Sequence, residues 1–391
     1  MSLVGAAAES STLERIGAPP VPSRPLRIGY LALETPIEGQ AAYTHVHEII
    51  RGLERRGNHV ERFFASRSGA SAGHSVLNRL VDYVRSNIQV IRALRRLDVV
   101  FVRGHFMAFP AAIVARAFRK IVVHEVNGTT DDLTVTYPWT QRVRYLIEWL
   151  QLIQLRTANA IFAVTPGLRS WASSAAKHDR VFLVPNAANT ALFRPDGPTF
   201  VTDRPYVVFV GGLVRWHGIG TMLKALRHQA WPAGVDLVVA GDGIERKLLA
   251  EAEEREPRLR WLRHLRYESV PDLLRGATAA LVPIEDPAGR SSRGVLPLKL
   301  YEAMACGVPV IVTDLPGQGD LVREEKAGLV IRPGDPAALA QAIALIVHDR
   351  ELAQRMGANG ARAARERHSW QQRADAINEV LIGCAQQRFA S

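Results

Sequence analysis

Two hydrophobic patterns alternate along the chain. Short runs rich in valine, isoleucine and leucine are each followed by a longer segment in which apolar residues recur at helical spacing. This alternation predicts a parallel β-sheet whose strands are joined by crossover helices. The first part of the chain is expected to form strands at 26–33, 98–104, 120–126 and 159–165, and an amphipathic helix at 41–57.

The same alternation starts again after residues 184–205, a stretch whose proline, glycine and asparagine content is typical of a linker. Ligands of open α/β sheets bind beyond the carboxyl ends of the strands, so two such units should face each other across a central cleft. The second unit is expected to contain strands at 206–212, 235–243, 279–285, 308–314 and 327–333, and a helix at 336–349.

The chain length agrees with two units. A chain of 391 residues is too long for one ordinary core. A content of 47% hydrophobic and 22% charged residues is typical of a soluble globular protein. The division that we expect is a flexible leader at 1–24, a Rossmann-like N-terminal domain at 25–190, a linker at 191–205, a Rossmann-like C-terminal domain at 206–369 and a final helix at 370–388 that packs back on the N-terminal domain.

The cysteines and the apolar runs bear on location. Cys306 and Cys384 lie far apart without metal-ligand spacing, so neither a disulfide framework nor a zinc site is indicated, and we expect a cytoplasmic setting. Residues 1–24 lack the basic and apolar regions of a signal peptide. No apolar run approaches the ~20 residues that span a bilayer. Any membrane contact is therefore expected to be peripheral, at the inner face of the plasma membrane.

The charge favours anionic partners. Lysine and arginine number 49 against 38 aspartate and glutamate residues, which gives a net charge of +11. A nucleotide diphosphate, an acidic lipid surface and a nucleic acid all fit this charge. A nucleic-acid-binding protein does not explain the glycine turns described next, and with 7% aromatic residues the chain has no interleaved aromatic and basic strand pattern. The other two partners stay open.

A glycine turn follows the first strand of the second unit. The segment 208–220, VFVGGLVRWHGIG, places Gly211 and Gly212 at the end of the strand, and Arg215 and His217 ahead of a helix. Glycines let a phosphate approach the backbone, and a helix N-terminus supplies N–H groups with partial positive charge. No third glycine follows at the spacing of a dinucleotide fingerprint. An ordinary structural turn remains the alternative.

Two more features belong to the same unit. Gly241 and Gly243 in VVAGDG form a second glycine turn, for which a structural role is again the alternative. The basic loop 284–307 carries Arg290 and Arg293 and leads into an apolar helix interrupted by Lys299 and Glu302. Glu302 is either a solvated helix residue or a carboxylate kept for a ligand. Together these features suit a nucleotide diphosphate, whose ribose hydroxyls can donate to the carboxylate.

Five segments of the second half, in this order, resemble the retaining glycosyltransferases of family 4, which have the GT-B fold. The resemblance covers the second half closely, and the first half more loosely through residues 34–60, 125–128 and 184–195. The pair "WHG" and "PLKLYE" resembles a recurring subgroup. The five segments are VFVGGLVRWHG, VVAGDG, VPDLLRGATAALVP, PLKLYEAMACGVPVI and AGLVIRPGDPAALAQAI.

The resemblance implies a donor site for a UDP- or GDP-type nucleotide-diphosphate sugar. Glu302 matches the second glutamate of the family's E-x7-E motif and is implied to bind the ribose, whereas the first glutamate falls at Gly294. In the phosphate loop, the usual arginine falls at Gly212 and the usual lysine at His217. The implied donor-binding residues are Gly39, Gly211, Gly212, Arg215, His217, Gly241, Gly243, Arg293, Gly294, Lys299, Leu300 and Glu302.

The first half is implied to supply acceptor contacts and a catalytic neighbourhood. The family often has a histidine after the fourth strand, and the register here is open between His124 and Asn127. We therefore treat His124, Glu125 and Asn127 as the candidate catalytic neighbourhood. An ordinary structural role is the alternative for His124 and equally for His45 and His105.

The resemblance also implies the reaction. The chain has no D-x-D triplet to clamp a metal–diphosphate complex, so no metal and no cofactor is expected, and cations and N–H groups would neutralise the diphosphate. No pair of cleft carboxylates is evident for a double displacement. Retention would then use the departing phosphate as the base, while the protein positions the reactants and stabilises the leaving group. The alternative is a sugar-nucleotide epimerase or hydrolase that binds the nucleotide in the same way.

The sequence says least about the acceptor substrate. Segment 74–97 has a helical apolar pattern that carries Arg79, Arg85, Arg92, Arg95 and Arg96, and aromatic and basic residues recur at 137–150. Such segments can rest on an anionic membrane, which would favour a lipid-linked acceptor in the synthesis of a cell-surface polysaccharide or glycolipid. If instead the apolar stripe packs on the sheet and the arginines are solvated, a soluble small-molecule acceptor is favoured.

Overall fold

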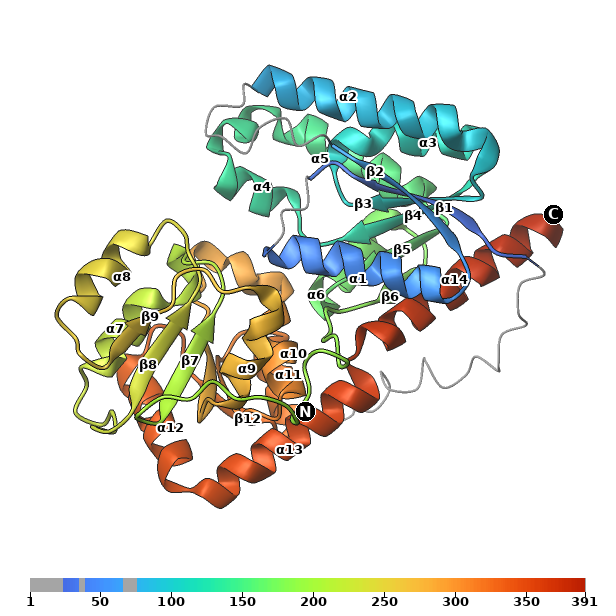
Figure 1. Ribbon diagram of the computed structural model, residues 1–391. Coiled ribbons are helices and arrows are strands. Elements are labelled where there is room, and N and C mark those ends of the chain that lie inside the picture. The colour runs from blue at the N-terminus through green and yellow to red at the C-terminus, as the bar shows by residue number, and fades with distance from the viewer. Residues whose placement is uncertain (1–23, 35–38, 66–75, 391) are drawn as a thin grey trace, which may run out of the picture.

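The structure, a computed structural model, describes residues 24–34, 39–65 and 76–390. It contains two parallel β-sheets of six strands each, with helices on both faces (Figure 1). The expected leader, apart from residue 24, and the first two residues of the expected helix at 74–97 lie outside the described residues. Among the helices described, none is both long and apolar enough to cross a membrane.

The N-terminal half is built on a sheet with the strand order β2-β1-β3-β4-β5-β6. All its strand pairs are parallel, so helices connect successive strands. Its strands are β1 (Arg27–Ala32), β2 (His59–Phe64), β3 (Val99–Arg103), β4 (Ile121–Val126), β5 (Ala160–Ala163) and β6 (Val181–Leu183). Its helices are α1 (Ala41–Arg55), α2 (Val76–Ala93), η3 (Leu94–Arg96), η4 (Phe106–Ala108), α3 (Phe109–Ala117), α4 (Thr130–Thr136), η5 (Pro138–Val143), α5 (Arg144–Thr157) and α6 (Pro166–Ala176).

The C-terminal half repeats the design with the order β12-β11-β10-β7-β8-β9. Its strands are β7 (Tyr206–Val210), β8 (Asp236–Ala240), β9 (Leu259–Trp261), β10 (Ala279–Val282), β11 (Val310–Thr313) and β12 (Gly328–Ile331). Its helices are η6 (Arg215–His217), α7 (Ile219–Leu226), α8 (Arg246–Glu253), η7 (Tyr267–Ser269), α9 (Val270–Arg275), η8 (Pro287–Arg293), α10 (Leu298–Ala305), α11 (Gln318–Glu325), α12 (Pro336–His348), α13 (Arg350–Arg367) and α14 (Trp370–Ala390).

All nine strands expected from the sequence form, but three others were missed. Strands β6 and β9 are only three residues long, too short to show a pattern. Strand β2 lies at the edge of its sheet, and its apolar run is interrupted by the half-buried Glu61 and the exposed Arg62. All three are edge strands, which are not buried on both sides and so lack the continuous apolar run that marks the central strands.

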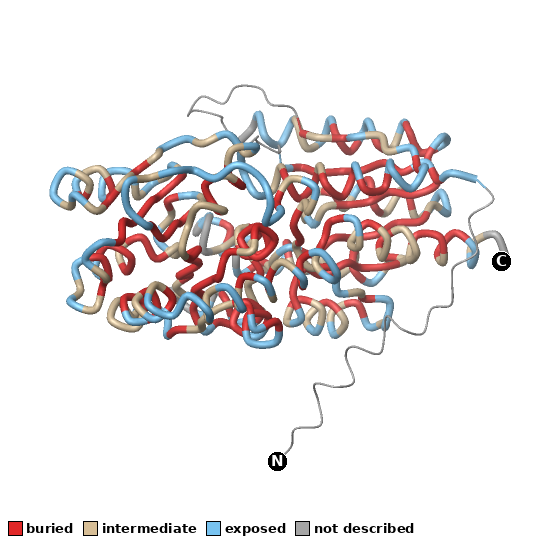
Figure 2. Tube along the Cα trace, turned by 60° about the horizontal axis from the view of Figure 1, so that its bottom comes forward, coloured by how far each residue is buried: buried red, intermediate tan, exposed pale blue. Residues whose placement is uncertain are grey.

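The hydrophobic core follows the two sheets, as the buried backbone in Figure 2 shows. Helices α1 and α14 cover one face of the first sheet, where Ile28 and Phe101 pack with Ile377 and Leu381. The helices α1 and α14 approach closely because α1 has a glycine at the contact: a Cβ atom on Gly52 would lie 2.3 Å from the Cβ atom of Ala374. The C-terminal helix thus completes the core of the N-terminal half.

The halves meet at the ends of their strands. The hydroxyl of Thr165, which follows β5, donates to the backbone oxygen of Arg293 over 2.5 Å. The side-chain amide of Asn186 donates to the backbone oxygen of Leu296 over 2.8 Å. Leu298, the first residue of α10, packs into the core cluster of the N-terminal half. These contacts bring the loop before α10 against the loops that follow β5 and β6.

Candidate active site

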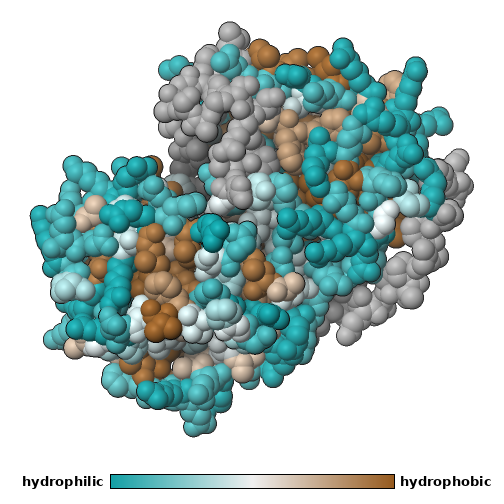
Figure 3. Space-filling view, viewed as in Figure 1, coloured by the Kyte–Doolittle hydropathy of each residue, from teal (hydrophilic) through white to brown (hydrophobic). Residues whose placement is uncertain are grey.

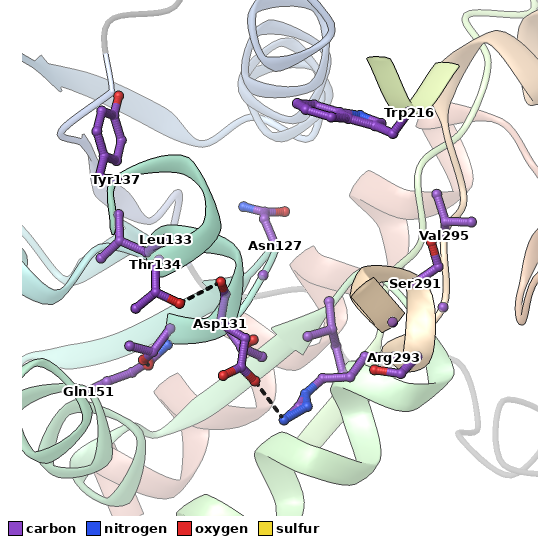
Figure 4. Close-up of a pocket in the computed structure, with 18 of the residues that line it drawn as sticks. Asn127, Asp131, Leu133, Thr134, Tyr137, Gln151, Trp216, Ser291, Arg293 and Val295 are labelled. Carbon is purple, nitrogen blue, oxygen red and sulfur yellow. Dashed lines mark hydrogen bonds and ion pairs between the residues drawn. The ribbon is translucent and has the colours of Figure 1, made fainter. Parts of the chain in front are cut away.

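A cavity of about 820 Å³ lies between the two halves (Figure 4). One wall comes from the loops after β3 and β4 and from α4 and α5. The other comes from η6, from η8 and from the segment that leads into α10. The cavity therefore occupies the place where strand ends of both sheets meet, as ligand sites of α/β sheets do. Of the predicted site residues, the described lining includes Asn127, His217, Arg293 and Gly294.

A buried charged network supports the N-terminal wall. The Glu125 carboxylate is 2% exposed, and its Oε1 atom lies 2.9 Å from His45 Nε2 and 2.7 Å from Arg103 Nη1. The side-chain amide of Asn127 also donates to Oε1 over 2.6 Å. Burial by itself raises the pKa of Glu125, but His45, Arg103 and the hydrogen bonds outweigh it and lower this pKa to about 2. Glu125 is therefore ionised at neutral pH.

This network orients Asn127. Because a carboxylate only accepts hydrogen bonds, the Asn127 atom facing it must be the amide nitrogen. The amide oxygen is thereby left to accept a hydrogen bond from a hydroxyl group in the cavity, which Asn127 lines. Glu125, which is outside the described lining of the cavity, thus orients Asn127, which belongs to it.

The histidines of this region lie in different environments. His124, on β4, is 3% exposed and borders only a side pocket of about 30 Å³, and burial lowers its pKa to about 4. His105 lines the cavity, but its Nδ1 accepts from the Met107 N–H over 3.1 Å, and burial lowers its pKa to about 4 as well. Between the two register alternatives, the structure brings Asn127 and not His124 to the cavity wall.

The two glycine turns of the C-terminal half pack on each other. A Cβ atom on Gly241 would lie 2.0 Å from the backbone oxygen of Gly211, and both residues have φ of 141°. A Cβ atom on Gly243 would lie 2.4 Å from the backbone oxygen of Leu213. Gly212 is exposed, and a Cβ atom there would meet no atom within 4 Å. Backbone packing therefore requires glycine at Gly241 and Gly243, the positive φ favours it at Gly211, and Gly212 leaves open space beside the turn.

The two basic side chains after the first glycine turn lie in different places. His217 lines the cavity, and its Nδ1 lies 2.6 Å from the backbone oxygen of Gly212, so Nδ1 carries the proton. The Arg215 side chain is 83% exposed and lies 3.9 Å from Glu245, and the described lining does not include it. The turn thus presents an imidazole to the cavity, while the guanidinium lies in solvent.

Lys299 and Glu302 are buried behind the turns. The Lys299 ammonium lies 3.9 Å from the centre of the Phe209 ring, and it has no hydrogen-bond partner among the described residues. A Cβ atom on Gly211 would lie 2.5 Å from it. Burial lowers the pKa of Lys299 to about 7, although Glu302 opposes this shift. The ammonium is thus held directly against the first glycine turn.

Glu302 is 7% exposed and borders, with Lys299, a small pocket of about 10 Å³. Burial raises the pKa of Glu302 to about 7, against the opposing effects of a Tyr267 hydrogen bond and of Lys299. Neither residue belongs to the described lining of the large cavity. The neighbouring Leu300 is fully buried in the core, and its N–H donates to the Pro297 oxygen over 3.1 Å. Its side chain contributes to packing.

The loop before α10 contributes Arg293 and Gly294. The Arg293 guanidinium lies 3.4 Å from Asp131 of α4, and this pair spans the two halves (Figure 4). Gly294 has φ of 89°, and a Cβ atom there would lie 3.3 Å from Thr165. Gly39, with φ of 84°, is close to His264 of the other half, where a Cβ atom would lie 3.9 Å from the ring. Of these three residues, Arg293 is the one whose side chain offers a cation.

Sequence reasoning missed three side chains of the cavity. Trp216 lies between two predicted residues, and Figure 4 shows its indole on the C-terminal side, across the cavity from Tyr137. Asp131 follows β4 closely, so the rule that sites form at the carboxyl ends of strands points to it. Gln151 lies inside a helical pattern and had no signal in the sequence. Among the described residues there is no group of three or more metal-ligating side chains.

Comparisons with known proteins agree with this geometry. Residues 195–363 match the family model "Glycosyl transferases group 1", and residues 42–192 match "Glycosyltransferase Family 4". The chain is 31% identical over 310 residues to a glycogen synthase of Mycobacterium tuberculosis, which spans 73% of this chain and 69% of that protein. It is 26% identical over 415 residues to a D-inositol 3-phosphate glycosyltransferase of Xylanimonas cellulosilytica, with 92% and 95% covered.

Solved structures share the architecture. Sucrose-phosphate synthase from Thermosynechococcus elongatus superimposes with a TM-score of 0.72 at 19% identity, covering 94% of this chain and 100% of that one. Anabaena HepE, solved in complex with UDP-glucose, has a TM-score of 0.67 at 18% identity and covers 92% and 100%. The two facing parallel sheets are thus the GT-B fold.

Proposed function

Because this chain belongs to the group 1 glycosyltransferases, we propose that it transfers a sugar from a nucleotide-diphosphate sugar to a hydroxyl group of an acceptor, with retention of configuration. The observation that carries the proposal is the arrangement at the carboxyl edge of the second sheet. There, two interlocked glycine turns lie against the Lys299 ammonium, with Glu302 behind them and the large cavity beside them. We further propose that the segments WHG and PLKLYE assign the chain to a recurring subgroup of this family.

The donor is proposed to bind across these groups. Glu302 accepts hydrogen bonds from the ribose. Lys299 and His217, the latter protonated on both ring nitrogens, compensate for the arginine and lysine that the phosphate loop lacks. Arg293 of η8 adds a cation from the C-terminal wall of the cavity, and its present partner is the half-exposed Asp131 of the opposite wall. The exposed Gly212 leaves room for a phosphate against the backbone. A UDP- or GDP-type donor fits these groups equally.

The chemistry is proposed to need no metal ion. The bond between the anomeric carbon and the phosphate oxygen breaks, the acceptor oxygen forms a bond to that carbon on the same face, and its proton passes to the departing phosphate. The buried and cavity-lining cations stabilise the negative charge of the leaving group. Asn127 accepts a hydrogen bond from the reacting sugar or the acceptor, and Glu125 is a positioning residue beneath it.

The acceptor is proposed to lie along the N-terminal wall. Thr134, Gln151 and Asp131 offer hydrogen-bonding groups there, and Tyr137 offers an aromatic face. Such a mixture suits a sugar, either soluble or linked to a lipid. We propose a role in the synthesis of a cell-surface polysaccharide or glycolipid. An epimerase or hydrolase would need no second substrate at this wall.

A two-stage assay tests the proposal. A thermal-shift panel of UDP- and GDP-sugars first identifies the donor, and release of the nucleotide diphosphate is then measured with and without acceptor sugars. Release that depends on the acceptor, with an α product from an α donor by NMR, supports retaining transfer. Acceptor-independent change of the donor would point to an epimerase or hydrolase, and no shift with any nucleotide would overturn the proposal.

A further inference from the structure

Helix α2 buries some polar side chains and exposes some apolar ones. Ser86 and Asn87 face the interior, 2% and 4% exposed, and Asn87 hydrogen-bonds to backbone groups of three residues. On the outside, Val81, Val84 and Ile88 are 58%, 49% and 41% exposed. A helix whose only partner is its own sheet turns its apolar stripe inward. The exposed stripe therefore indicates a partner that the described residues do not supply.

The exposed apolar residues continue onto the neighbouring helices. Trp149 of α5 lies 6.3 Å from Phe109 of α3 between ring centres, and α3 in turn contacts α2. Eleven of the seventeen large hydrophobic side chains exposed in the described structure come from residues 80–149, and Figure 3 shows hydrophobic atoms along the upper edge over α2. We call this surface the α2–α5 face. Its members are Leu80, Val81, Val84, Ile88, Phe118, Tyr137, Trp139, Val143, Tyr145, Leu146 and Trp149.

Basic residues accompany the apolar ones. Arg79, Arg85 and Arg92 of α2 and Arg95 of η3 are exposed, and Asp82 is the single acidic residue of α2. Within the described residues, none of these four arginines forms an ion pair of 4.0 Å or less with a carboxylate. The face therefore combines exposed tryptophan and tyrosine with uncompensated positive charge.

The α2–α5 face adjoins the cavity. Tyr137, which is 41% exposed, belongs to both, and Figure 4 shows its ring at the edge of the cavity. Helix α5 turns Ile147 toward the cavity, whereas Tyr145 and Trp149 on the same helix are exposed. A partner on this face would therefore lie next to the wall where we placed the acceptor.

We propose that the α2–α5 face docks on an anionic phospholipid bilayer and directs the cavity toward a lipid-linked acceptor. Tryptophan and tyrosine are the residues that prefer the membrane–water interface. Arginines near an anionic surface strengthen binding, each by about fivefold. A second copy of this chain on the same face would bring like-charged arginines together, which disfavours self-association. The inference rests on the proposed function only for the nature of the acceptor.

Vesicle sedimentation tests the docking. Full-length protein should bind vesicles of phosphatidylglycerol and phosphatidylcholine at low salt, bind pure phosphatidylcholine much more weakly, and be released by high salt. The double variant Arg85→Gln, Arg92→Gln should bind about 25-fold more weakly. Arg255→Gln, Arg350→Gln, which neutralises two exposed arginines of the other half, should bind like the parent. Val81→Asp should lose binding, whereas Val201→Asp, at a comparably exposed valine, should keep it.

Several outcomes would overturn the docking. They are no binding to anionic vesicles at low salt, equal losses in the test and control variants, and self-association of the protein that the same variants abolish. The thermal shift with nucleotide sugars, measured without vesicles, keeps the two proposals apart. Vesicle binding without any nucleotide response defeats the proposed function alone, and a nucleotide response without vesicle binding defeats the docking alone.

Discussion

The hydroxyl of Tyr267 donates a hydrogen bond of 2.8 Å to Oε1 of Glu302. Tyr267 belongs to η7 and Glu302 to α10, so the contact joins two segments of the C-terminal half and holds the carboxyl group in one orientation. The other oxygen, Oε2, is the one we assign to the ribose. Since the site is buried, a hydrogen bond to this carboxylate is stronger than one in water.

Glu302→Ala should weaken the binding of a nucleotide diphosphate. Each charge-assisted hydrogen bond that is lost costs about 1.5–3 kcal/mol, so affinity should fall at least tenfold. Isothermal titration calorimetry measures this directly. Glu324→Ala, at an exposed glutamate of α11, is the matched control and should bind like the parent. Equal affinity of Glu302→Ala and the parent would remove Glu302 from the site.

The Lys299–Glu302 pair should give the free energy of unfolding a minimum near pH 7. The raised pKa of Glu302 means that the folded state keeps a proton that the unfolded state loses between about 4.5 and 7, so stability falls as pH rises through that window. The lowered pKa of Lys299 means that the folded state loses a proton that the unfolded state keeps between about 7 and 10.5, so stability rises there.

Urea denaturation at pH 5, 7 and 9 tests this minimum. Lys299→Met should remove the rise above pH 7, and Glu302→Gln should remove the fall below it. Because Lys299→Met changes the pH dependence only above pH 7 and Glu302→Gln only below it, each variant is a control for the other. A parent protein whose pH dependence is unchanged by both substitutions would contradict the assignment.

Asn127→Ala should lower kcat by at least tenfold, because it removes the oxygen that we assign to a sugar hydroxyl. Asn127→Asp should also lower the melting temperature, since a second carboxylate would then stand where the amide now lies 2.6 Å from Glu125. Steady-state kinetics and thermal denaturation measure the two effects. A larger loss of kcat in His124→Gln than in Asn127→Ala would assign the role to His124 instead.

His217→Ala should weaken donor binding by about tenfold, as expected for one hydrogen bond to a charged group. Arg215→Ala is the matched control from the same η6 segment, and we expect a smaller effect because its side chain is 83% exposed and lies near Glu245. Calorimetry with the nucleotide diphosphate distinguishes them. If Arg215→Ala has the larger effect, the diphosphate is bound by the Arg215 guanidinium and not by the His217 imidazole.

Turnover should persist in EDTA. The proposed diphosphate-binding groups are Lys299, His217, Arg293 and backbone N–H groups. Because they neutralise the diphosphate without a metal ion, removal of divalent ions should leave kcat within about twofold. Nucleotide release in EDTA, compared with the same reaction in Mg²⁺ or Mn²⁺, is the measurement. Full loss in EDTA with recovery on adding Mn²⁺ would show that a metal ion completes the site.

The sequence pattern alone predicted two α/β units, each built on a parallel sheet. Central strands of parallel sheets are buried on both faces and so appear as continuous apolar runs, which is why the eight central strands were predicted correctly. The ninth expected strand, β12, lies at an edge but has the short apolar run GLVI. The glycine turns were equally visible, because strand-to-helix turns that need close backbone approach require glycine whatever surrounds them. The resemblance of these motifs to a known family then implied the GT-B fold.

The environment of each side chain was decided by tertiary structure. Periodicity indicated that α2 is a helix with an apolar stripe, but not that Val81, Val84 and Ile88 would face outward. It did not decide between His124 and Asn127, because the reach of a side chain depends on where the strand ends relative to the opposite half. The pKa shifts of Lys299 and Glu302 likewise arise from burial, which packing by distant segments produces. Local sequence thus determines which elements form, whereas exposure, ionisation and contact across the cavity depend on residues far apart in the chain.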